Sequence, residues 1–236
     1  MGPLPVKNPI DVIVAALPPL DGARILDIGC GRGALAKALS VQGAQVVGVD
    51  PDPAAVVEAQ REAPEGVYIL ARAETLPFRD ASFDGAAFQN SLHHVAVPVM
   101  QTALRAALQA VRAGRPLVVM EPLAAGSLFE MVKSIEDETD VRAAAQNAVE
   151  TITSDSSIHL VQHDTFLRLS TFRSFEAALA TIVGVDPSRA LVARRNEDDL
   201  RDHFFRLAVR TESGFRLEQP MRTYVLKRHS SDGRAH

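Results

Sequence analysis

The stretch "ILDIGCGRGALAKAL", residues 25–39, constrains the fold of this chain more than any other. An apolar run ends in Asp27, and Gly29, Gly31 and Gly33 then follow at alternate positions before a helical pattern begins. Glycine adopts left-handed backbone conformations without strain and has no Cβ atom, so these residues permit a tight turn that another molecule can approach closely. A helix that starts after such a turn also directs free N–H groups toward that molecule. The stretch therefore predicts a strand, a ligand-contacting turn and a helix.

The segment from Arg24 to Pro122 repeats this alternation of strand and helix. Short apolar runs rich in β-branched residues alternate with longer stretches of helical periodicity. Connections of that length join parallel strands and place helices on both faces of the sheet, which is the doubly wound α/β class. The expected strands cover residues 23–29, 44–50, 67–71, 83–89 and 115–122, and the expected helices cover residues 34–43, 51–64 and 100–111.

The second half of the chain has a different character, because seven of the ten phenylalanines lie after Leu123. The patterns predict helices over residues 128–152, 174–183 and 187–210, a strand over 165–175, and a final strand over 214–228. Pro220 lacks an N–H group for the ladder, so we expect it to interrupt this final strand or to place it at an edge of the sheet. Residues 229–236 are expected to form a disordered tail.

Composition narrows the possible classes of protein. With 236 residues, 47% of them hydrophobic, the chain is long enough for one sizeable core. The formal net charge of -4 gives no general attraction for nucleic acid, which is not an expected partner. A single cysteine, Cys30, excludes an internal disulfide and a cysteine-cluster metal site. Neither a signal peptide nor a run of membrane-spanning length is evident, so we expect a cytoplasmic protein without membrane insertion, as a monomer or homodimer.

Two classes of nucleoside cofactor fit the glycine-rich turn. Asp50 ends the second expected strand, where a carboxylate can accept hydrogen bonds from both hydroxyls of a ribose. With Ala34 as its last position, "GCGRGA" also satisfies the G-x-G-x-x-G/A pattern of dinucleotide-binding turns. Asp27 separates the two classes, because a carboxylate beside the turn repels a pyrophosphate and attracts a cation such as the ammonium group of an amino-acid moiety.

The sequence "D-x-G-C-G-x-G" at residues 27–33, followed by the acid at the end of the second strand, resembles class I S-adenosylmethionine-dependent methyltransferases. The resemblance continues through "ARAETLPFRDASFDGAAFQNSLHHV" at residues 71–95 and "ALRAALQAVRAGRPLVVMEP" at residues 103–122. It is closest to the small-molecule branch of the "methyltransferase type 11" kind. It implies a doubly wound, seven-stranded, mostly parallel Rossmann-like sheet, with an antiparallel last strand and a helical cap after the fifth strand.

The same resemblance implies how the cofactor, S-adenosyl-L-methionine, and its product S-adenosyl-L-homocysteine would be bound. Asp27 and the turn would hold the methionine part, and Asp50 would hold the ribose hydroxyls. The N–H group of Ala73 would meet the adenine with Glu74 nearby, and Gln89 would lie under the sulfonium with its carbonyl toward the amino group. The implied cofactor-binding residues are Asp27, Gly29, Cys30, Gly31, Gly33, Asp50, Pro51, Ala73, Glu74 and Gln89.

One residue departs from the family pattern. Arg72 stands where the family often has an aspartate that accepts a hydrogen bond from the adenine amino group. A guanidinium cannot accept a hydrogen bond, so Arg72 either stacks on the adenine or points away from it.

Histidines provide the candidates for acid–base or metal chemistry. His93 and His94 follow the fourth strand at the edge where open α/β sheets bind substrates, so either is a candidate general base. The alternative is a structural or helix-starting role. His159 and His163 would share a face only if their segment were helical, and no third ligand accompanies them, so no metal is predicted.

The predicted function is in-line transfer of a methyl group from S-adenosyl-L-methionine to a small-molecule acceptor through oxygen, nitrogen, carbon or sulfur. Residues 1–228 would form one methyltransferase domain, with a cofactor-binding core at about 22–122, cap and substrate elements at about 123–213, and the final strand at 214–228. Two alternatives stay open. An NAD(P)-binding oxidoreductase is disfavoured by Asp27 and by the lack of a hydride-transfer constellation, and a non-catalytic S-adenosylmethionine-binding protein is favoured by Arg72.

Overall fold

The computed structural model describes residues 2–185 and 187–229, so residues 230–236 of the expected tail lie outside the described part. The chain divides into two compact units. The sheet unit comprises residues 8–121, 144–164 and 222–229, and the helix unit comprises residues 2–7, 122–143 and 165–221. The chain passes from one unit to the other within two long strands, β6 (Ile158–Phe172) and β8 (Gly214–Arg228).

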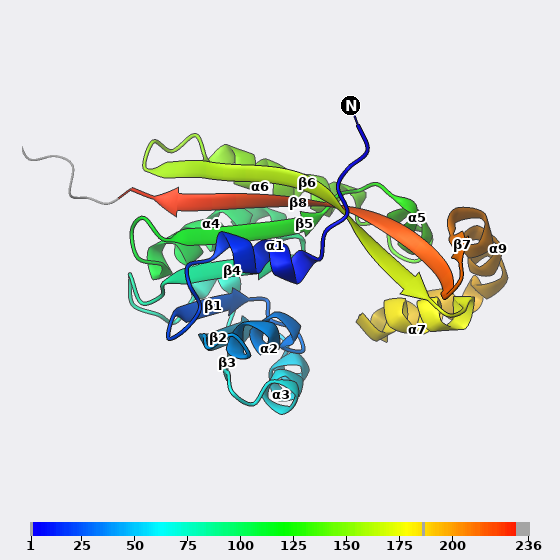
Figure 1. Ribbon diagram of the computed structural model, residues 1–236, viewed down its shortest axis with the longest axis horizontal. Helices are drawn as coiled ribbons and strands as arrows, with labels where there is room; N and C mark the ends of the chain where they lie inside the picture. Colours follow the sequence, from blue (N-terminus) through cyan, green and yellow to red (C-terminus); the bar gives the residue numbers. More distant parts are fainter. Residues whose placement is uncertain (1, 186, 230–236) are drawn as a thin grey trace, which may run out of the picture. The chain divides into compact units, whose positions relative to one another are not determined.

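Five strands of the first half form the parallel part of the sheet. They are β1 (Arg24–Ile28), β2 (Gln45–Asp50), β3 (Val67–Leu70), β4 (Gly85–Gln89) and β5 (Pro116–Pro122). The strand order is β3-β2-β1-β4-β5-β8-β6, and the first five strands of this order pair in parallel (Figure 1). All residues of β5 are buried, as expected for a strand covered on both faces. The doubly wound α/β class is therefore confirmed.

The last long strand, β8, runs antiparallel to β5. The amide of Gly114 donates to the carbonyl of Arg228 at one end of the pair (2.8 Å). The amide of Leu123 donates to the carbonyl of Pro220 at the other end (2.9 Å). Residue numbers therefore fall along β8 as they rise along β5, and Figure 1 draws the two arrows in opposite directions. The antiparallel last strand predicted from the sequence is confirmed.

The prediction that Pro220 would break this strand or place it at an edge is wrong. β8 is continuous, and it lies between β5 and β6. In an antiparallel pair, the missing N–H of Pro220 would have bonded to the carbonyl opposite, that of Leu123. That carbonyl accepts instead from the side chains of Arg142 (3.0 Å) and Gln219 (2.9 Å), so the carbonyl of Leu123 is not left unpaired.

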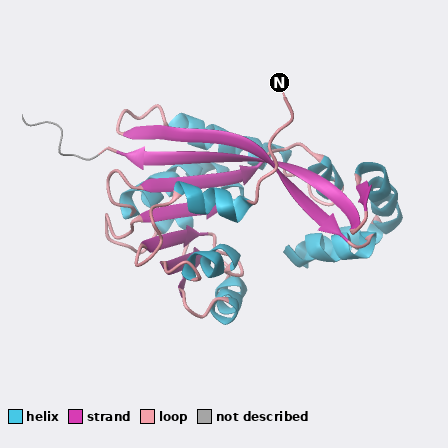
Figure 2. Cartoon of the chain, viewed as in Figure 1, coloured by secondary structure: helices cyan, strands magenta, loops and turns pink. Residues whose placement is uncertain are grey.

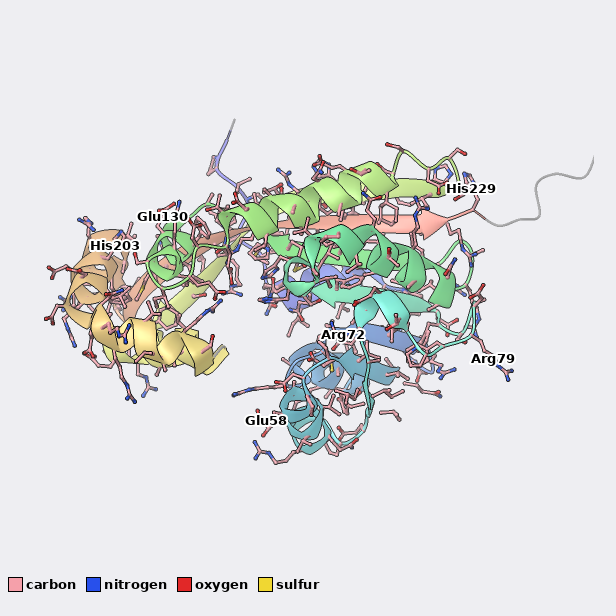
Figure 3. All side chains as sticks on the ribbon, turned by 180° about the vertical axis from the view of Figure 1, so that it is seen from behind. Glu58, Arg72, Arg79, Glu130, His203 and His229 are labelled. Atoms are coloured by element: carbon pink, nitrogen blue, oxygen red, sulfur yellow. The ribbon has the colours of Figure 1, made fainter. Side chains whose placement is uncertain are left out.

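Helices cover both faces of the sheet unit. α1 (Pro9–Ala16), α2 (Ala34–Ser40) and α3 (Pro53–Glu62) belong to the first half, followed by α4 (Met100–Ala110) and α6 (Thr139–Ile152). α1 lies in front of the sheet in Figure 1, whereas α4 and α6 lie on the face turned to the viewer in Figure 3. Asn8 and Asp52 accept hydrogen bonds from amides of the first turns of α1 and α3, and a proline follows each. α3 lies within the helix expected over residues 51–64, whereas α1 was not predicted.

The helix unit contains α5 (Ser127–Lys133), α7 (Phe175–Val185), α8 (Ala190–Arg195), α9 (Glu197–Leu207) and the short strand β7 (Val209–Thr211). Its core includes Phe175, Phe204 and Leu217, and the aromatic rings of the first two pack edge to face. These phenylalanines are therefore core residues of this unit. Figure 2 shows that this unit contains mainly helices.

Several elements in this half differ from the predictions. β6 covers residues 158–172 where a strand was expected over 165–175, and the helix expected over 187–210 is divided into α8 and α9. The helix expected over residues 128–152 is two helices, because the carboxylate of Asp137 accepts the amide of Thr139 and starts α6 (3.0 Å). Val209–Thr211, expected to be helical, forms β7 and pairs with the start of β8, so the sheet has eight strands among the described residues, seven of them in the order above. No described helix is both long and apolar enough to cross a membrane.

Candidate functional site

The carboxyl ends of β1, β2, β3 and β4 meet at one edge of the sheet unit, because these four strands are parallel neighbours. In an open α/β sheet this edge is where ligands bind. The residues predicted to bind a cofactor all lie in or directly after these strands: Asp27, Gly29, Cys30, Gly31, Gly33, Asp50, Pro51, Ala73, Glu74 and Gln89.

The three glycines of the turn have different surroundings. All have positive φ angles, +71° at Gly29, +51° at Gly31 and +80° at Gly33. A Cβ atom on Gly29 would overlap the side chain of Ser91, and one on Gly33 would press against Ala59 at 3.3 Å. A Cβ atom on Gly31 would meet nothing within 4 Å. Gly29 and Gly33 therefore allow the turn to pack against its own protein, whereas the backbone at Gly31 faces open space where a ligand can approach.

Asp50 fixes the geometry of this turn. One carboxylate oxygen accepts a hydrogen bond from the amide of Gly31, and the other accepts from the amide of Asp52, both at 2.9 Å. A carboxylate oxygen can accept more than one hydrogen bond, so both oxygens retain capacity for ribose hydroxyls. Pro51, which follows directly, is exposed at this edge.

Asp27 is the most unusual charge of the site. The residue is only 1% exposed, and within the described chain its Oδ2 atom has no hydrogen-bond partner. Burial raises the pKa of Asp27 to about 7; the backbone amide of Ala36 opposes this shift, and the negative charge of Asp50 adds to it. A buried carboxylate without a counter-charge is unfavourable, and a cation bound beside it would relieve the penalty.

Cys30 contributes backbone, not a reactive thiol, to the turn. Its amide donates to the carbonyl of Val49 at 3.0 Å. Its side chain is buried, and a Cβ atom on Gly48 would lie 2.9 Å from its sulfur. Burial, and then the charges of Asp27 and Asp50, raise the pKa of the Cys30 thiol far above its ordinary value. A thiol that retains its proton is a poor nucleophile.

The end of β4 adds a second unpartnered polar atom to the same edge. Gln89 ends the strand and is partly buried. Asn90 has a φ of +55°, and no described residue bonds to its buried Oδ1 atom. The hydroxyl of Ser91 donates to the carbonyl of Ile28 at 2.6 Å and thereby ties the end of β4 to that of β1.

His93 and His94, adjacent in the sequence, have different surroundings. His93 is 5% exposed, and its Nδ1 atom contacts the carboxylate of Glu121. Glu121 is fully buried in β5 and also accepts the amides of Ser91 (3.1 Å) and Leu92 (2.8 Å). His94 is exposed. His93 is thus part of a buried arrangement that holds the loop after β4, and His94 is the accessible imidazole.

At the end of β3, the loop carries the expected adenine contacts. Ala73 begins a short 3-10 turn, Ala73–Thr75, and the amide of Ala71 donates to the carbonyl of Asp50 (3.1 Å), which fixes the loop beside β2. The guanidinium of Arg72 lies 3.8 Å from the carboxylate of Glu74, and the Arg72 side chain is 74% exposed (Figure 3). Arg72 therefore pairs with its neighbour across an exposed surface.

Sequence reasoning missed Glu121, Ser91 and Asn90. A signal for Glu121 existed, since it is the one acid in the apolar run "PLVVMEP". The idea of a shared helical face for His159 and His163 is wrong, because both lie in β6, where four residues span roughly 13 Å. In the described chain, no group of three or more histidine, cysteine, aspartate or glutamate side chains could hold a metal ion.

Comparison with known proteins supports the same reading of this edge. Residues 26–119 match a family model described as a methyltransferase domain. A ubiquinone biosynthesis O-methyltransferase from Azorhizobium caulinodans is 42% identical over 113 residues, which cover 41% of this chain and 45% of that protein. A demethylmenaquinone methyltransferase from Beutenbergia cavernae is 34% identical over 100 residues, covering 42% and 41% respectively. The chain thus covers less than half of the length of these curated relatives.

Solved structures extend the likeness in fold to most of the chain. A candidate methyltransferase from Bacillus halodurans C-125 superposes with a TM-score of 0.62 at 16% identity, covering 93% of this chain and 97% of that one. A [4+2]-cyclase, SpnF, superposes with a TM-score of 0.64 at 15% identity, covering 94% and 81%. Because a cyclase shares the fold, the fold alone does not define the reaction. The matched segment, residues 26–119, agrees with the resemblance to a methyltransferase domain found in the sequence.

Proposed function

We propose that the whole protein transfers a methyl group from S-adenosyl-L-methionine to a small-molecule acceptor, because residues 26–119 match a methyltransferase domain. The observation that carries the proposal is the buried, unpartnered carboxylate oxygen of Asp27 in front of the glycine turn. This group suits the ammonium of a methionine moiety and would repel the pyrophosphate of NAD. The NAD(P)-binding alternative is therefore disfavoured.

The residues present fit this cofactor. Asp27 and the backbone at Gly31 would hold the methionine part, Asp50 the ribose, and the loop at Ala73 and Glu74 the adenine. Bound S-adenosyl-L-methionine supplies an electrophilic methyl group on a cationic sulfur. The chain would position the acceptor and exclude water, and positioning alone can account for a large part of such a rate enhancement.

The acceptor-binding residues belong, in our proposal, to the helix unit, which lies outside the matched segment and corresponds roughly to the cap expected at residues 123–213. Two matched relatives are named for ubiquinone and demethylmenaquinone, so hydroxylated aromatic compounds of the quinol type are the first class to test. Where such a hydroxyl must lose a proton, His94 is the accessible base, and His93 is held by Glu121.

A label-transfer assay tests this function. The protein is incubated with S-adenosyl-L-methionine carrying a deuterated methyl group and with a panel of phenols, quinols and aromatic acids, and the products are analysed by mass spectrometry. We expect one labelled methyl group per modified acceptor, equimolar S-adenosyl-L-homocysteine, and no transfer by Asp50→Ala. Cofactor binding without transfer to any class of small molecule would favour the non-catalytic alternative.

A further inference from the structure

Arg168, in the part of β6 that belongs to the helix unit, is a partly buried cation without a counter-charge. Its Nε atom is buried and lacks a hydrogen-bond partner. Over residues 2–185 and 187–229, no hydrogen bond or ion pair reaches its guanidinium. Burial lowers the pKa of Arg168, and the positive charge of the nearby Arg142 lowers it further.

Two arginines of this unit, Arg142 and Arg189, are buried, and the acids around them are engaged. Glu138 accepts from Nε and Nη2 of Arg142 at 2.9 and 2.6 Å. The other carboxylate oxygen of Glu138 accepts from Arg189 at 2.6 Å, and Glu136 also pairs with Arg189 at 2.8 Å. Arg142 and Arg189 thus engage both carboxylates, and neither carboxylate forms an ion pair with Arg168 among the described residues.

The backbone that carries Arg168 is held in place. The amide of Leu167 donates to the carbonyl of Pro5 at 2.9 Å, and its carbonyl accepts from the amide of Lys7 at 3.1 Å. The N-terminal segment therefore pairs with β6 next to Arg168. A side chain on such a paired strand is positioned before a ligand arrives, which lowers the entropic cost of binding.

A buried N–H group without an acceptor is unfavourable, and arginine presents a planar fork of donors that matches the two oxygens of a carboxylate or phosphate. We propose that Arg168 binds an oxyanion substituent, a carboxylate or a phosphate, of the methyl acceptor. The link to an acceptor rests on the proposed methyltransferase function, whereas the oxyanion site itself rests on the surroundings of Arg168.

Calorimetric titration with sodium phosphate and with sodium benzoate, at constant ionic strength against chloride, tests the site. Wild type is compared with Arg168→Gln, and with Arg173→Gln, an exposed arginine of the same unit, as the matched control for charge. We expect saturable binding of at least one oxyanion by wild type and by the control, and at least tenfold weaker binding by Arg168→Gln. Binding of phosphate alone would indicate an acceptor that carries a phosphate group. Binding of benzoate alone would indicate an acceptor that carries a carboxylate. Equal affinity in all three proteins, or no binding by wild type, would overturn the proposal.

Stability provides a second readout, because a structural arginine and a ligand-binding arginine behave in opposite ways. Arg168→Met removes an unpaired, partly buried charge, so we expect the ligand-free variant to unfold at the same temperature as wild type or a higher one, and phosphate to stabilise only wild type. A variant that unfolds earlier, with no loss of oxyanion binding, would show a structural role. S-adenosyl-L-homocysteine binding, measured on the same samples, separates the proposals: its absence in every protein would refute the methyltransferase function and leave the oxyanion site standing.

Discussion

Asp27 combines two properties that rarely occur together, complete burial and an unpaired carboxylate oxygen. Its pKa is raised from 3.8 to about 7, so the folded protein holds this proton over a pH range in which the unfolded chain has lost it. The charge of Asp27 therefore lowers the free energy of unfolding, and this penalty is absent below about pH 4 and fully present above about pH 7. A bound cation would remove this penalty, so stability and cofactor affinity should respond to pH in opposite directions.

The first prediction concerns the stability of the ligand-free protein. Asp27→Asn removes the buried charge and should raise the free energy of unfolding at pH 8 by on the order of 2 kcal/mol. Near pH 4, where wild-type Asp27 is protonated when folded, the two proteins should be equally stable. Urea unfolding at both pH values measures the difference. A variant less stable than wild type at pH 8 would show that Asp27 is structurally paired.

The second prediction concerns binding. The carboxylate form of Asp27 is the one that attracts an ammonium group, so affinity for S-adenosyl-L-homocysteine should rise with pH up to about 7 and then level off. Proton release on binding, measured by calorimetry in two buffers of different ionisation enthalpy, reports this ionisation. Asp27→Asn should bind more weakly and without this pH dependence, and a wild-type affinity that is flat between pH 5 and 8 would contradict the assignment.

A third residue-scale prediction concerns Glu121, which holds the amides of Ser91 and Leu92 and contacts His93. Glu121→Ala should lower the free energy of unfolding by about 3 kcal/mol, because it leaves several buried polar groups without a partner. Glu121→Gln retains an acceptor and should cost less. Denaturant unfolding of both variants measures the effect, and equal losses would mean that the carboxylate charge of Glu121, not its role as a hydrogen-bond acceptor, provides the stability.

At this scale the sequence predicted the residues whose neighbours are local. Asp27 and Asp50 flank a turn that is recognisable from the spacing of its glycines. Glu121 and Ser91 were missed because their partners lie about thirty and sixty residues away, on strands whose pairing the sequence does not specify. Asp27 was predicted as a cofactor ligand, but its lack of any hydrogen-bond partner for Oδ2 is visible only in the structure.

The elements show the same division. The strands and α-helices between Arg24 and Pro122 were predicted to within about three residues at each end, because many of them begin or end at a local signal such as a proline or glycine. In the second half, β8 was misjudged because Arg142 and Gln219 satisfy the carbonyl that Pro220 cannot. The start of α6 depends on a local hydrogen bond to Asp137 that helical periodicity does not reveal, and β7 depends on its pairing with β8.

A fourth prediction belongs to the start of β8. A Cβ atom on Gly214, at a φ of +131°, would collide with the carbonyl of Phe172 on β6. Gly214→Ala should therefore lower the free energy of unfolding by about 2 kcal/mol or more. Gly184, in α7 of the same unit, has nothing within 4 Å of its Cβ position, so Gly184→Ala should stabilise by about 0.5–1 kcal/mol. Thermal unfolding of both variants compares them, and similar shifts would contradict the β6–β8 packing.

On the scale of the whole molecule, the two units carry different parts of the account. The sheet unit holds every predicted cofactor residue, and the helix unit holds Arg168. The related cyclase fold shows that sheet architecture alone does not decide the chemistry, so the identity of the cofactor is the claim on which the rest depends.

Calorimetric titration of the full chain with S-adenosyl-L-homocysteine, alongside an identical titration with NAD, tests that claim most directly. Asp50→Ala is the binding-deficient control, and Asp52→Ala, which removes only the cap of α3, is its matched neighbour. We predict saturable binding of S-adenosyl-L-homocysteine by wild type and Asp52→Ala, at least tenfold weaker binding by Asp50→Ala, and no binding of NAD. Binding of NAD without binding of S-adenosyl-L-homocysteine would contradict the account.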